Sequence, residues 1–409
     1  MCAQDLHGQI LPTSDRLPKL KLVTADRIAQ MVAPERVEWE AYVQRSEKFA
    51  LAERAKLADE LATAELSNST PAPSNSVMFD VSGKKTDDPW FATEQARNLA
   101  SIVLSYQTPT GGWSKAVDYS KGPRSQGVHW TSQKSPGWHY CGTLDNRGTT
   151  EQIRFLAAHY SATKNQLCAQ AALDGIDWLL NAQYPSGGWP QVYPLEPGYH
   201  ESITLNDNAM VHAMQELMAV SSGKAPYEFV DAAVRDRASR AVKRGLDCLF
   251  RCQIVVDGRP TLWCAQHDPI DLKPSGARAK EPPSISGGEG AELVKFLMRD
   301  ANDSPEARKA IYAAVEWLNL HQITNLRRIK NEAGKTDYVR DDQSTEVYWA
   351  RFYDLKTQLP IFAGSQDGVI YSSFSEMAKN NKVAYDYFTT KPRDVVTKEI
   401  PRWKKRFGF

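Results

Sequence analysis

The sequence predicts an all-α fold, an (α/α)3 toroid of helical hairpins with short irregular β additions. The main observation is a repeat, because an apolar run ends in Gln-x-x-x-Gly-Gly-Trp at residues 107–113 and again at 183–189. A looser copy runs from Gln253 to Trp263, and Gln322 marks a candidate fourth copy. The first three glutamines are 76 and 70 positions apart (183 minus 107, 253 minus 183), which leaves room for two helices each time.

Two further observations support this fold class. Repeated hairpins bury one face against their neighbours, so they either extend as an open solenoid or close into a ring. Glycine and aromatic residues recur at one rim of the hairpins, which favours the ring. Strand patterns are few and short, mainly at 192–193 and 368–371. The composition, with 42% hydrophobic and 24% charged residues, excludes wholesale disorder and allows one large core.

The first part of the chain differs from the rest. Residues 1–33 show little pattern, whereas 35–66 combines many Ala, Glu and Lys with spaced aromatic residues, typical of an amphipathic helix or helix pair docked on the main body. Residues 67–89 are rich in Ser, Asn, Pro, Lys and Asp and are expected to form a loop. We therefore expect an N-terminal helical extension with a linker at 1–89, and the toroid at 90–409.

Within the toroid, helices are expected where apolar residues recur with a period near 3.6. The expected helices cover residues 93–106, 152–160, 169–182, 208–220, 229–253, 290–299 and 305–320. Together they correspond to about three hairpins.

The charge and apolar pattern exclude several classes of partner. The formal net charge of +1 gives no sequence-wide basic field for nucleic acid or a membrane surface. No apolar run approaches the roughly 20 residues that span a bilayer, and residues 1–10 lack the pattern of a signal peptide. The chain is either cytoplasmic or, as we expect, a secreted or periplasmic monomer whose signal has been removed. Its 11 Trp and 16 Tyr suit the flat platforms of sugar-binding sites.

The six cysteines show no spacing that implies a disulfide framework. Cys248, Cys252 and Cys264 with His267 form a candidate Cys3His zinc set. We favour the alternative of buried or free thiols, because one member lies across a turn and the chain is not finger-like.

Two polar clusters each lie just ahead of an expected helix. The first contains Asp145, Asn146 and Thr150, and the second contains Asp207 between two asparagines. The two acids are 62 positions apart (207 minus 145), close to one repeat, so a ring would place both at one rim. Carboxylate and amide oxygens are hard donors that suit Ca²⁺. Each cluster alone is more simply explained as a helix N-cap, and their joint position makes the metal site an equal alternative.

A third cluster, His267 with Arg278 and Lys280, lies in a Pro-rich segment that is not expected to be helical. Loops carried on a rigid scaffold often hold binding residues. The alternative is that these loop cations are simply solvated.

Taken together, these segments resemble the family 10 polysaccharide lyases, the pectate lyases with an α/α toroid. The resemblance spans about residues 90–368, and its pieces occur in order. They are Gly111-Gly112-Trp113-Ser114-Lys115, Asp145-Asn146 with Thr150, Asn206-Asp207-Asn208-Ala209-Met210, Trp263-Cys264-Ala265-Gln266-His267-Asp268, Ala277-Arg278-Ala279, Glu281-Pro282-Pro283-Ser284, Ser286-Gly287-Gly288-Glu289 and Arg351-Phe352-Tyr353-Asp354-Leu355.

The resemblance implies a calcium-dependent anti β-elimination that cleaves polygalacturonate at internal bonds and leaves 4,5-unsaturated oligogalacturonides. By the same resemblance, Asp145 and Asp207 bind the calcium with Asn146 beside them, and Arg278 removes the C5 proton. Neutralising the carboxylate next to C5 would stabilise the enolate-like transition state more than the ground state. Calcium and Lys115 near Arg278 would disfavour its charged form. The substrate contacts implied are Lys115, Trp113, Asn146, Thr150 and Arg351.

One position departs from the family pattern. After the Arg351 motif the family has a Gly-Arg-Asp turn whose arginine binds a substrate carboxylate, and here Ser365 stands in its place. Serine cannot form an ion pair with a carboxylate. A weaker or altered subsite, or a less charged substrate, would follow unless Arg147 or Arg340 compensates.

Two other functions stay open at this point. An inverting glycoside hydrolase would use Asp145 and Asp207 as acid and base, about 6.5–9.5 Å apart, and would form no double bond. A non-catalytic or altered-specificity uronan-binding protein would bind the polymer without turnover.

Overall fold

The computed structural model describes residues 20–75, 79–132, 142–301, 304–332, 334 and 336–408. Its contacts divide the chain into two units. The N-terminal unit is Leu22–Cys248, and the C-terminal unit is Leu249–Phe409 with Leu20 and Lys21. The division between an extension and a toroid at residue 90 stays a prediction.

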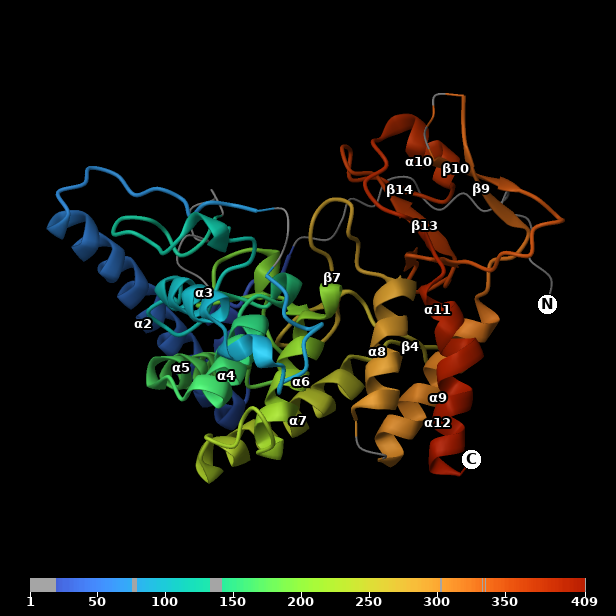
Figure 1. Cartoon of the computed structure of the whole chain (residues 1–409). Helices are drawn as coiled ribbons and strands as arrows, with labels where there is room; N and C mark the ends of the chain where they lie inside the picture. The colour runs from blue at the N-terminus through green and yellow to red at the C-terminus, as the bar shows by residue number, and fades with distance from the viewer. Residues whose placement is uncertain are drawn as a thin grey trace. The chain divides into compact units, whose positions relative to one another are not determined.

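The N-terminal unit is mainly helical, and except for a short helix at 25–29 its α-helices fall where the sequence predicts them (Figure 1). Ends shift by only a few residues, since caps decide them: the Thr93 hydroxyl accepts from the Ala96 N–H, and Asn165 accepts from the Leu167 N–H. The helices are α1 (Ala25–Ala29), α2 (Ala33–Thr63), α3 (Glu94–Ser105), α4 (Thr150–Thr163), α5 (Gln166–Ala182), α6 (Ala209–Ser222) and α7 (Ala232–Cys252), with short 3-10 turns η1 (Pro89–Ala92), η2 (Tyr119–Lys121), η3 (Asp145–Arg147), η4 (Tyr199–Glu201) and η5 (Asn206–Asn208). Strands β1 (Gly142–Thr143) and β2 (Val192–Tyr193) pair antiparallel, and β3 is Ile203–Thr204.

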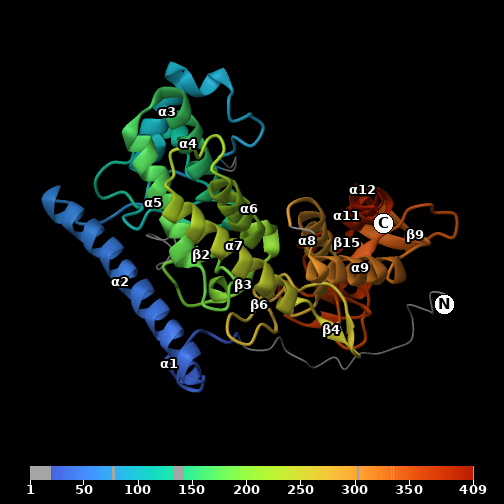
Figure 2. The same ribbon diagram turned by 90° about the horizontal axis from the view of Figure 1, so that it is seen from below.

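The N-terminal extension forms one long helix, α2, that packs beside α5 (Figure 2). The Tyr42 hydroxyl donates to the Ala182 carbonyl at 3.1 Å, and the ring of Trp39 lies 5.3 Å from that of Tyr184. At the far end, Glu60 accepts two hydrogen bonds from the Arg124 guanidinium, 3.0 and 2.5 Å long. The docking predicted for this segment is therefore confirmed, as a single helix.

The glutamine of each repeat joins its own turn to a neighbouring helix. The Gln107 amide donates to the carbonyls of Gly111 and Ala171, both at 2.9 Å. Gln183 repeats this with Gly187 and Ala241, both at 2.8 Å, and Gln253 with Thr261 and Ala310 at 2.9 and 3.1 Å. The amide group has two N–H donors, so one side chain satisfies two backbone acceptors.

The tryptophan of each repeat donates to a helix carbonyl four residues before the glutamine. The four indole N–H groups bond at 2.7–2.8 Å, as Trp113 to Val103, Trp189 to Leu179, Trp263 to Leu249 and Trp349 to Leu318. Leu318 precedes Gln322 by the same four positions, which confirms the fourth copy of the repeat. In that copy the Gln322 amide lies near the Asn319 side chain instead, at 3.5 Å.

The first glycine of the Gly-Gly-Trp turns has a positive φ. Gly111 and Gly187 both have φ of 100°, and a Cβ there would lie 2.4 and 2.3 Å from the carbonyl oxygens of Asp174 and Arg244. Only glycine fits such a close approach. The repeated turn thus serves helix packing.

The C-terminal unit combines helices with short strands (Figure 1). Its helices are α8 (Gly287–Arg299), α9 (Pro305–Leu320), α10 (Phe374–Asn380), α11 (Lys391–Asp394) and α12 (Ile400–Phe407), with a π-helical turn at Val395–Glu399. Its strands are β4 (Val255–Val256), β5 (Arg259–Pro260), β6 (Gln266–His267), β7 (Pro274–Ser275), β8 (Ile285–Ser286), β9 (Leu326–Lys330), β10 (Thr336–Arg340), β11 (Trp349–Ala350), β12 (Phe352–Tyr353), β13 (Pro360–Ala363), β14 (Ile370–Tyr371) and β15 (Phe388–Thr389).

These strands form more β structure than the sequence predicts. One sheet has the order β14-β13-β12-β8, and antiparallel pairs join β9 to β10, β11 to β15, β4 to β5 and β6 to β7. An aromatic core joins Phe352 and Phe362 of this sheet to Phe374 and Tyr387. The whole chain is thus helix-rich with short strands, and the three-hairpin closure stays a prediction.

None of the described helices has the length and apolar character of a membrane span.

Candidate active site

Two turns of the same backbone shape precede α4 and α6. Leu144 and Leu205 have φ of −94° and −96°, and two residues later Asn146 and Asp207 have φ of 49° and 50°. Asn and Asp are the non-glycine residues that best tolerate this left-handed conformation. The register between the turns is 61 positions (205 minus 144), so Asp145 corresponds to Asn206 and Asn146 to Asp207. The acid and the amide have exchanged places between the two turns.

Neither acid is a helix cap. The N-cap of α4 is Thr149 and that of α6 is Asn208, and no side chain makes a capping hydrogen bond at either helix. Asp145 is only 5% exposed, while Asp207 is exposed. The interpretation as N-caps is therefore wrong for Asp145 and Asp207, although Asn208 of the second cluster occupies the N-cap position of α6 without a capping side-chain bond.

Asp145 is paired with Lys115. The Lys115 ammonium donates to the Asp145 carboxylate, and the exposed fractions of the two side chains are 20% and 7%. Thr149 holds the two segments together, because its hydroxyl donates to the Trp113 carbonyl and accepts from the Trp113 N–H, both at 3.0 Å. The Thr143 N–H adds a bond of 2.9 Å to the same carbonyl. These bonds to Trp113 position the Gly-Gly-Trp turn so that Lys115 lies beside Asp145.

The predicted substrate contact at Trp113 is wrong. Its side chain is 0% exposed and its indole N–H is used by Val103 inside the fold. A buried ring cannot stack on a polysaccharide. Trp113 acts through its backbone, which fixes the turn before Lys115.

Asn146 and Thr150 lie in different surroundings. Asn146 is exposed and lines a small cavity with Lys115. Thr150 is 5% exposed, donates to the Arg147 carbonyl at 3.1 Å, and lines a separate cavity of about 270 Å³ with His212. The roles of both as substrate contacts stay predictions.

The two turns offer the donor chemistry that Ca²⁺ requires. They adjoin, with Cα atoms within 8 Å of each other, and bring together two carboxylates and the amide oxygens of Asn146 and Asn206. The Asn206 amide donates to the Asp207 carboxylate at 2.8 Å. The described residues contain no group of three or more His, Cys, Asp or Glu placed to hold a metal ion. Calcium takes 6–8 oxygen ligands, so the residues fit a site that substrate or water completes.

Arg278 of the C-terminal unit is held in a fork by Glu281. Its Nε and Nη2 donate to the two carboxylate oxygens at 2.8 and 2.7 Å, and its backbone N–H adds a bond of 3.1 Å. Nη2 also donates to the Tyr385 hydroxyl at 3.0 Å, and that hydroxyl donates to Glu281. Bidentate pairs of this kind fix orientation as well as charge. The loop that carries Arg278 is non-helical, as predicted.

The pair sets the protonation of its members. Burial would raise the pKa of Glu281, but hydrogen bonds from Arg278 and Tyr385 outweigh it and hold the pKa below its usual value. Burial and the neighbouring Glu281 carboxylate raise the pKa of Tyr385. Glu281 is therefore charged and Tyr385 neutral over a wide range of pH.

Arg351 contacts the same tyrosine. Its guanidinium lies 4.2 Å from the centroid of the Tyr385 ring, and the Lys280 ammonium lies 4.5 Å from that centroid. Arg351 Nη2 donates to Glu289 at 3.0 Å, and the Ser286 hydroxyl donates to the other oxygen of Glu289. Tyr385 thus joins the two predicted site arginines of this unit, Arg278 and Arg351, in one cluster.

The family model for pectic acid lyase matches residues 107–396. The chain belongs to the pectic acid lyase family. Solved structures agree: the family 10 polysaccharide lyase from Cellvibrio cellulosa is 28% identical with a TM-score of 0.65, and covers 81% of this chain and 98% of its own. An aspartate-to-alanine variant from the same organism, in complex with trigalacturonic acid, has the same identity and TM-score and covers 79% and 98%. Comparison with curated protein sequences found no match. The protein is a polysaccharide lyase.

Glu281, Glu289 and Tyr385 contact the predicted site arginines. Glu281 and Glu289 lie in motifs that carry the resemblance, but the sequence assigns no role to either, and Tyr385 is not in those motifs. Glu281 follows Arg278 by three positions, a spacing typical of a local ion pair. Glu289 follows Ser286 by three positions, as in a capping box, although Ser286 bonds the carboxylate and makes no cap bond. Tyr385 lies 104 positions from Glu281 in a segment without a pattern.

Two other predicted features have structural explanations. His267 is 0% exposed, its Nε2 accepts from the Cys264 N–H at 3.1 Å, and its Nδ1 bonds the Leu272 carbonyl at 2.9 Å. Burial lowers the pKa of His267 to about 4. With both ring nitrogens bonded to backbone groups, His267 is not a zinc ligand.

Ser365 donates its hydroxyl to the Lys382 carbonyl at 2.8 Å, so it belongs to a loop contact.

Proposed function

We propose that this lyase is a calcium-dependent pectate lyase that cleaves polygalacturonate at internal bonds and leaves 4,5-unsaturated oligogalacturonides. The observation that carries the proposal is the Lys115–Asp145 pair beside two adjoining turns rich in carboxylate and amide oxygens. Membership of the pectic acid lyase family and the likeness to a lyase solved with trigalacturonic acid support the substrate class.

The site residues predicted from the sequence would each take a part of the proposed chemistry. Bound calcium would supply positive charge that neutralises the uronate carboxylate and so acidifies the C5 proton. In the N-terminal unit, Asp145 and Asp207 with Asn146 would hold the ion, and Lys115 would bind the carboxylate of the substrate. In the C-terminal unit, Arg278 would take the C5 proton. The electron pair of the broken C5–H bond then forms the C4–C5 double bond as the C4–O bond breaks, and water protonates the leaving oxygen.

The surroundings of Arg278 both aid and oppose its role as a base. Glu281 favours the charged guanidinium, whereas a base must be neutral. Lys280 and Arg351, both on the Tyr385 ring, act in the opposite direction. We therefore expect lyase activity to rise in alkaline solution, where the guanidine form is more populated.

The test follows the ultraviolet absorbance of the unsaturated product. The protein is incubated with polygalacturonate and Ca²⁺, and then with a chelator. We expect absorbance to rise with calcium and to stop on chelation. The absence of a calcium-dependent rise with any uronan would refute the proposal. Reducing ends without a double bond would indicate the glycoside hydrolase with Asp145 and Asp207, and binding without turnover would indicate a uronan-binding protein.

The proposal extends to the setting of the protein. Polygalacturonate is a polymer of the plant cell wall, so the lyase would act outside the cell, as a secreted or periplasmic monomer.

A further inference from the structure

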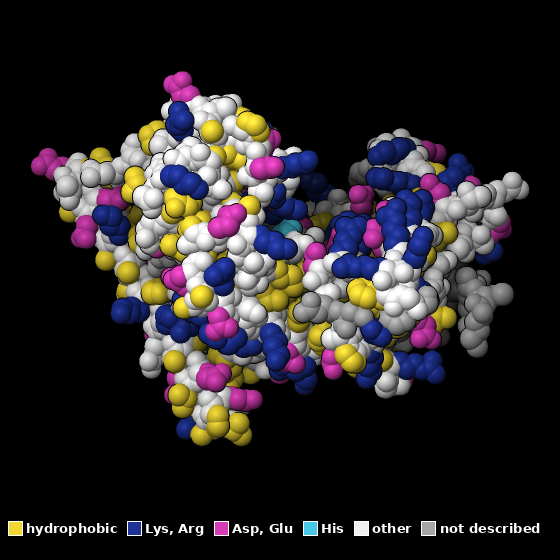
Figure 3. Space-filling view, turned by 60° about the horizontal axis from the view of Figure 1, so that its bottom comes forward, with side chains coloured by type: hydrophobic (Ala, Val, Ile, Leu, Met, Phe, Trp, Pro, Cys, Tyr) yellow, Lys and Arg dark blue, Asp and Glu magenta, His cyan; other side chains and the backbone are white. Residues whose placement is uncertain are grey.

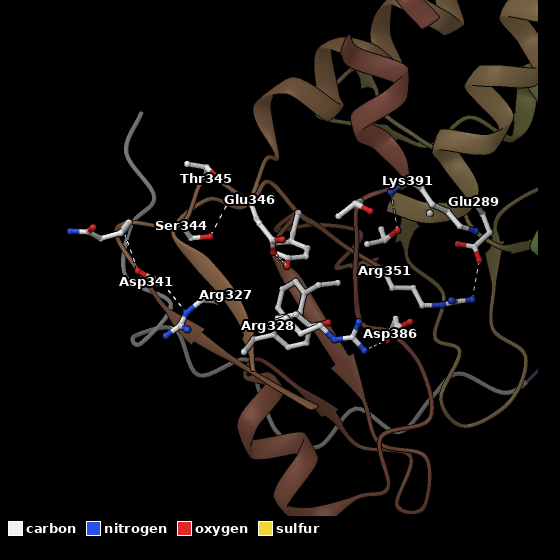
Figure 4. A pocket seen from close by; sticks show the side chains of 17 residues that line it. Glu289, Arg327, Arg328, Asp341, Ser344, Thr345, Glu346, Arg351, Asp386 and Lys391 are labelled. Carbon is white, nitrogen blue, oxygen red and sulfur yellow. Dashed lines mark hydrogen bonds and ion pairs between the residues drawn. The ribbon is translucent and has the colours of Figure 1, made fainter. Parts of the chain in front are cut away.

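The C-terminal unit contains a cavity that extends beyond the cluster around Tyr385. Its volume is about 740 Å³, within the range of about 300–1,000 Å³ for small-molecule sites. Arg351 and Glu289 line one end of it (Figure 4). The elements that line the rest are the β9–β10 hairpin, the segment at 341–348, β15 and the start of α11. The cavity is therefore continuous with a predicted substrate contact.

Aromatic rings form part of the wall. Tyr338, Tyr348 and Phe388 all line the cavity. The rings of Tyr338 and Phe388 lie 4.5 Å apart and those of Tyr338 and Tyr348 6.0 Å apart, so they are packed together. Aromatic faces beside polar groups are suited to sugar rings.

The lining mixes both signs of charge, with four cations and four acids. Figure 3 shows the same mixture on the C-terminal unit, at right, where Lys and Arg side chains gather with Asp and Glu among them. Several groups are already satisfied: Arg327 is paired with Asp341 at 2.8 Å, Arg351 with Glu289 at 3.0 Å, and Glu346 accepts from the Tyr348 hydroxyl.

Two cations are available to a ligand. Arg328 lies 3.4 Å from Asp386, and the side chains are 51% and 73% exposed, so this pair contributes little and is easily exchanged. Figure 4 shows that pair lying between the Arg327–Asp341 and Arg351–Glu289 pairs. Lys391 makes no ion pair within the described part of the chain.

The chemistry of the lining selects one class of ligand. A purely anionic group such as phosphate would meet four carboxylates in the wall. A neutral sugar would leave Arg328 and Lys391 without a new partner. A uronate residue offers a carboxylate to the cations and hydroxyl groups to acceptors such as Glu346 and Asp386.

We propose that this cavity is a uronate subsite beyond Arg351, in which Arg328 and Lys391 bind the carboxylate of a galacturonate residue. The identity of the sugar rests on the proposed pectate lyase function. The subsite would supply the cationic contact that Ser365 cannot make. Arg340 is not its source, because it pairs with the exposed Asp342 at 3.1 Å and does not line the cavity.

The test uses a double variant that combines Arg328→Ala and Lys391→Ala, and compares it with the parent protein. The matched control is Arg340→Ala, which removes a cation from the same hairpin outside the cavity. Binding of saturated hexagalacturonate and trigalacturonate is measured by calorimetry, and kcat and KM are measured on polygalacturonate. We expect the double variant to bind hexagalacturonate at least about tenfold more weakly and to raise KM with kcat unchanged, since uniform binding is removed. The control should match the parent.

Other outcomes would overturn the proposal. An unchanged affinity of the double variant for hexagalacturonate would refute the subsite. An equal loss of affinity in Arg340→Ala would also refute it, since the loss would then be a general effect of charge. Calorimetry needs no turnover, so a parent chain that binds hexagalacturonate through Arg328 and Lys391 but gives no unsaturated product would refute the lyase mechanism and keep the subsite.

Discussion

The Lys115–Asp145 pair of the N-terminal unit and the Arg278–Glu281 pair of the C-terminal unit differ in how firmly they are held. In both, the acid is buried, with side-chain exposures of 7% for Asp145 and 5% for Glu281. Lys115 reaches Asp145 with a single ammonium group. Arg278 meets Glu281 with two guanidinium nitrogens and a backbone N–H, and Tyr385 closes the group.

The difference teaches which group is free to change partner. A lysine is a compact charge on a flexible stem, while the arginine fork is rigid and directional. Under the proposed function, Lys115 would leave Asp145 for a substrate carboxylate when calcium binds to that aspartate. Glu281 fixes the position of Arg278. The proposed role of Arg278 as the base requires this, because a base must meet one atom of the substrate.

The largest effect is expected from Arg278→Ala. Loss of the base should lower kcat by about 10²–10⁴-fold, the range for general acid–base catalysis. The measurement is the rate of unsaturated product formation at saturating polygalacturonate. Lys273→Ala is the control, because it removes an exposed cation five positions before Arg278 and should retain most of the rate. A fully active Arg278→Ala variant would show that the fork is structural.

A somewhat smaller effect is expected from Asp145→Asn, which keeps the shape of the side chain and removes its charge. Activity at a fixed calcium concentration should fall by about 10²–10³-fold, as when one electrostatic contact to a transition state is lost. Titration with calcium should restore part of the rate, because the ion binds more weakly. Asp177→Asn, at an exposed pair with Arg237, is the control. If added calcium has no effect, Asp145 does not act through the metal.

The smallest effect is expected from Glu281→Gln. A glutamine at this position cannot form the bidentate ion pair that orients Arg278, so activity at its optimum should fall by about tenfold or less. Loss of the carboxylate charge also disfavours the protonated guanidinium. The alkaline rise of kcat should shift to lower pH. An unshifted profile would show that Glu281 only positions Arg278.

The same variant has a stability readout with a defined sign. The pKa of Glu281 is held below its usual value, so the folded state binds fewer protons at this group than the unfolded chain does. Its stabilising contribution is complete above the ordinary glutamate pKa and is lost as the pH falls through the lower folded value. The difference in free energy of unfolding between the parent and Glu281→Gln should therefore shrink on acidification. Denaturant titrations at several pH values would measure it.

The sequence predicts the helices and polar turns because their signals are local. Helix α9 matches the expected range at both ends, since Ser304 caps it and Pro305 begins it. The C-terminal sheet was underestimated because strands of two residues, such as β12, are too short to show alternation. Tyr385 could not be found, since its partners lie far away in sequence. The prediction for Trp113 was wrong because a tryptophan in a glycine turn is typical of an exposed sugar platform, whereas its indole N–H bonds the Val103 carbonyl inside the fold.

The hydrogen bonds of the repeated glutamine and tryptophan also bear on how such repeats diverge. Their acceptors are backbone carbonyls, such as those of Val103, Leu179 and Ala171, so the side chains at these positions carry no part of the contact. Replacing the side chain at an acceptor position would leave the backbone acceptor in place, whereas replacing the glutamine or the tryptophan would remove the donor. The repeat is therefore marked by a few polar and indole groups and not by the apolar residues that accept from them.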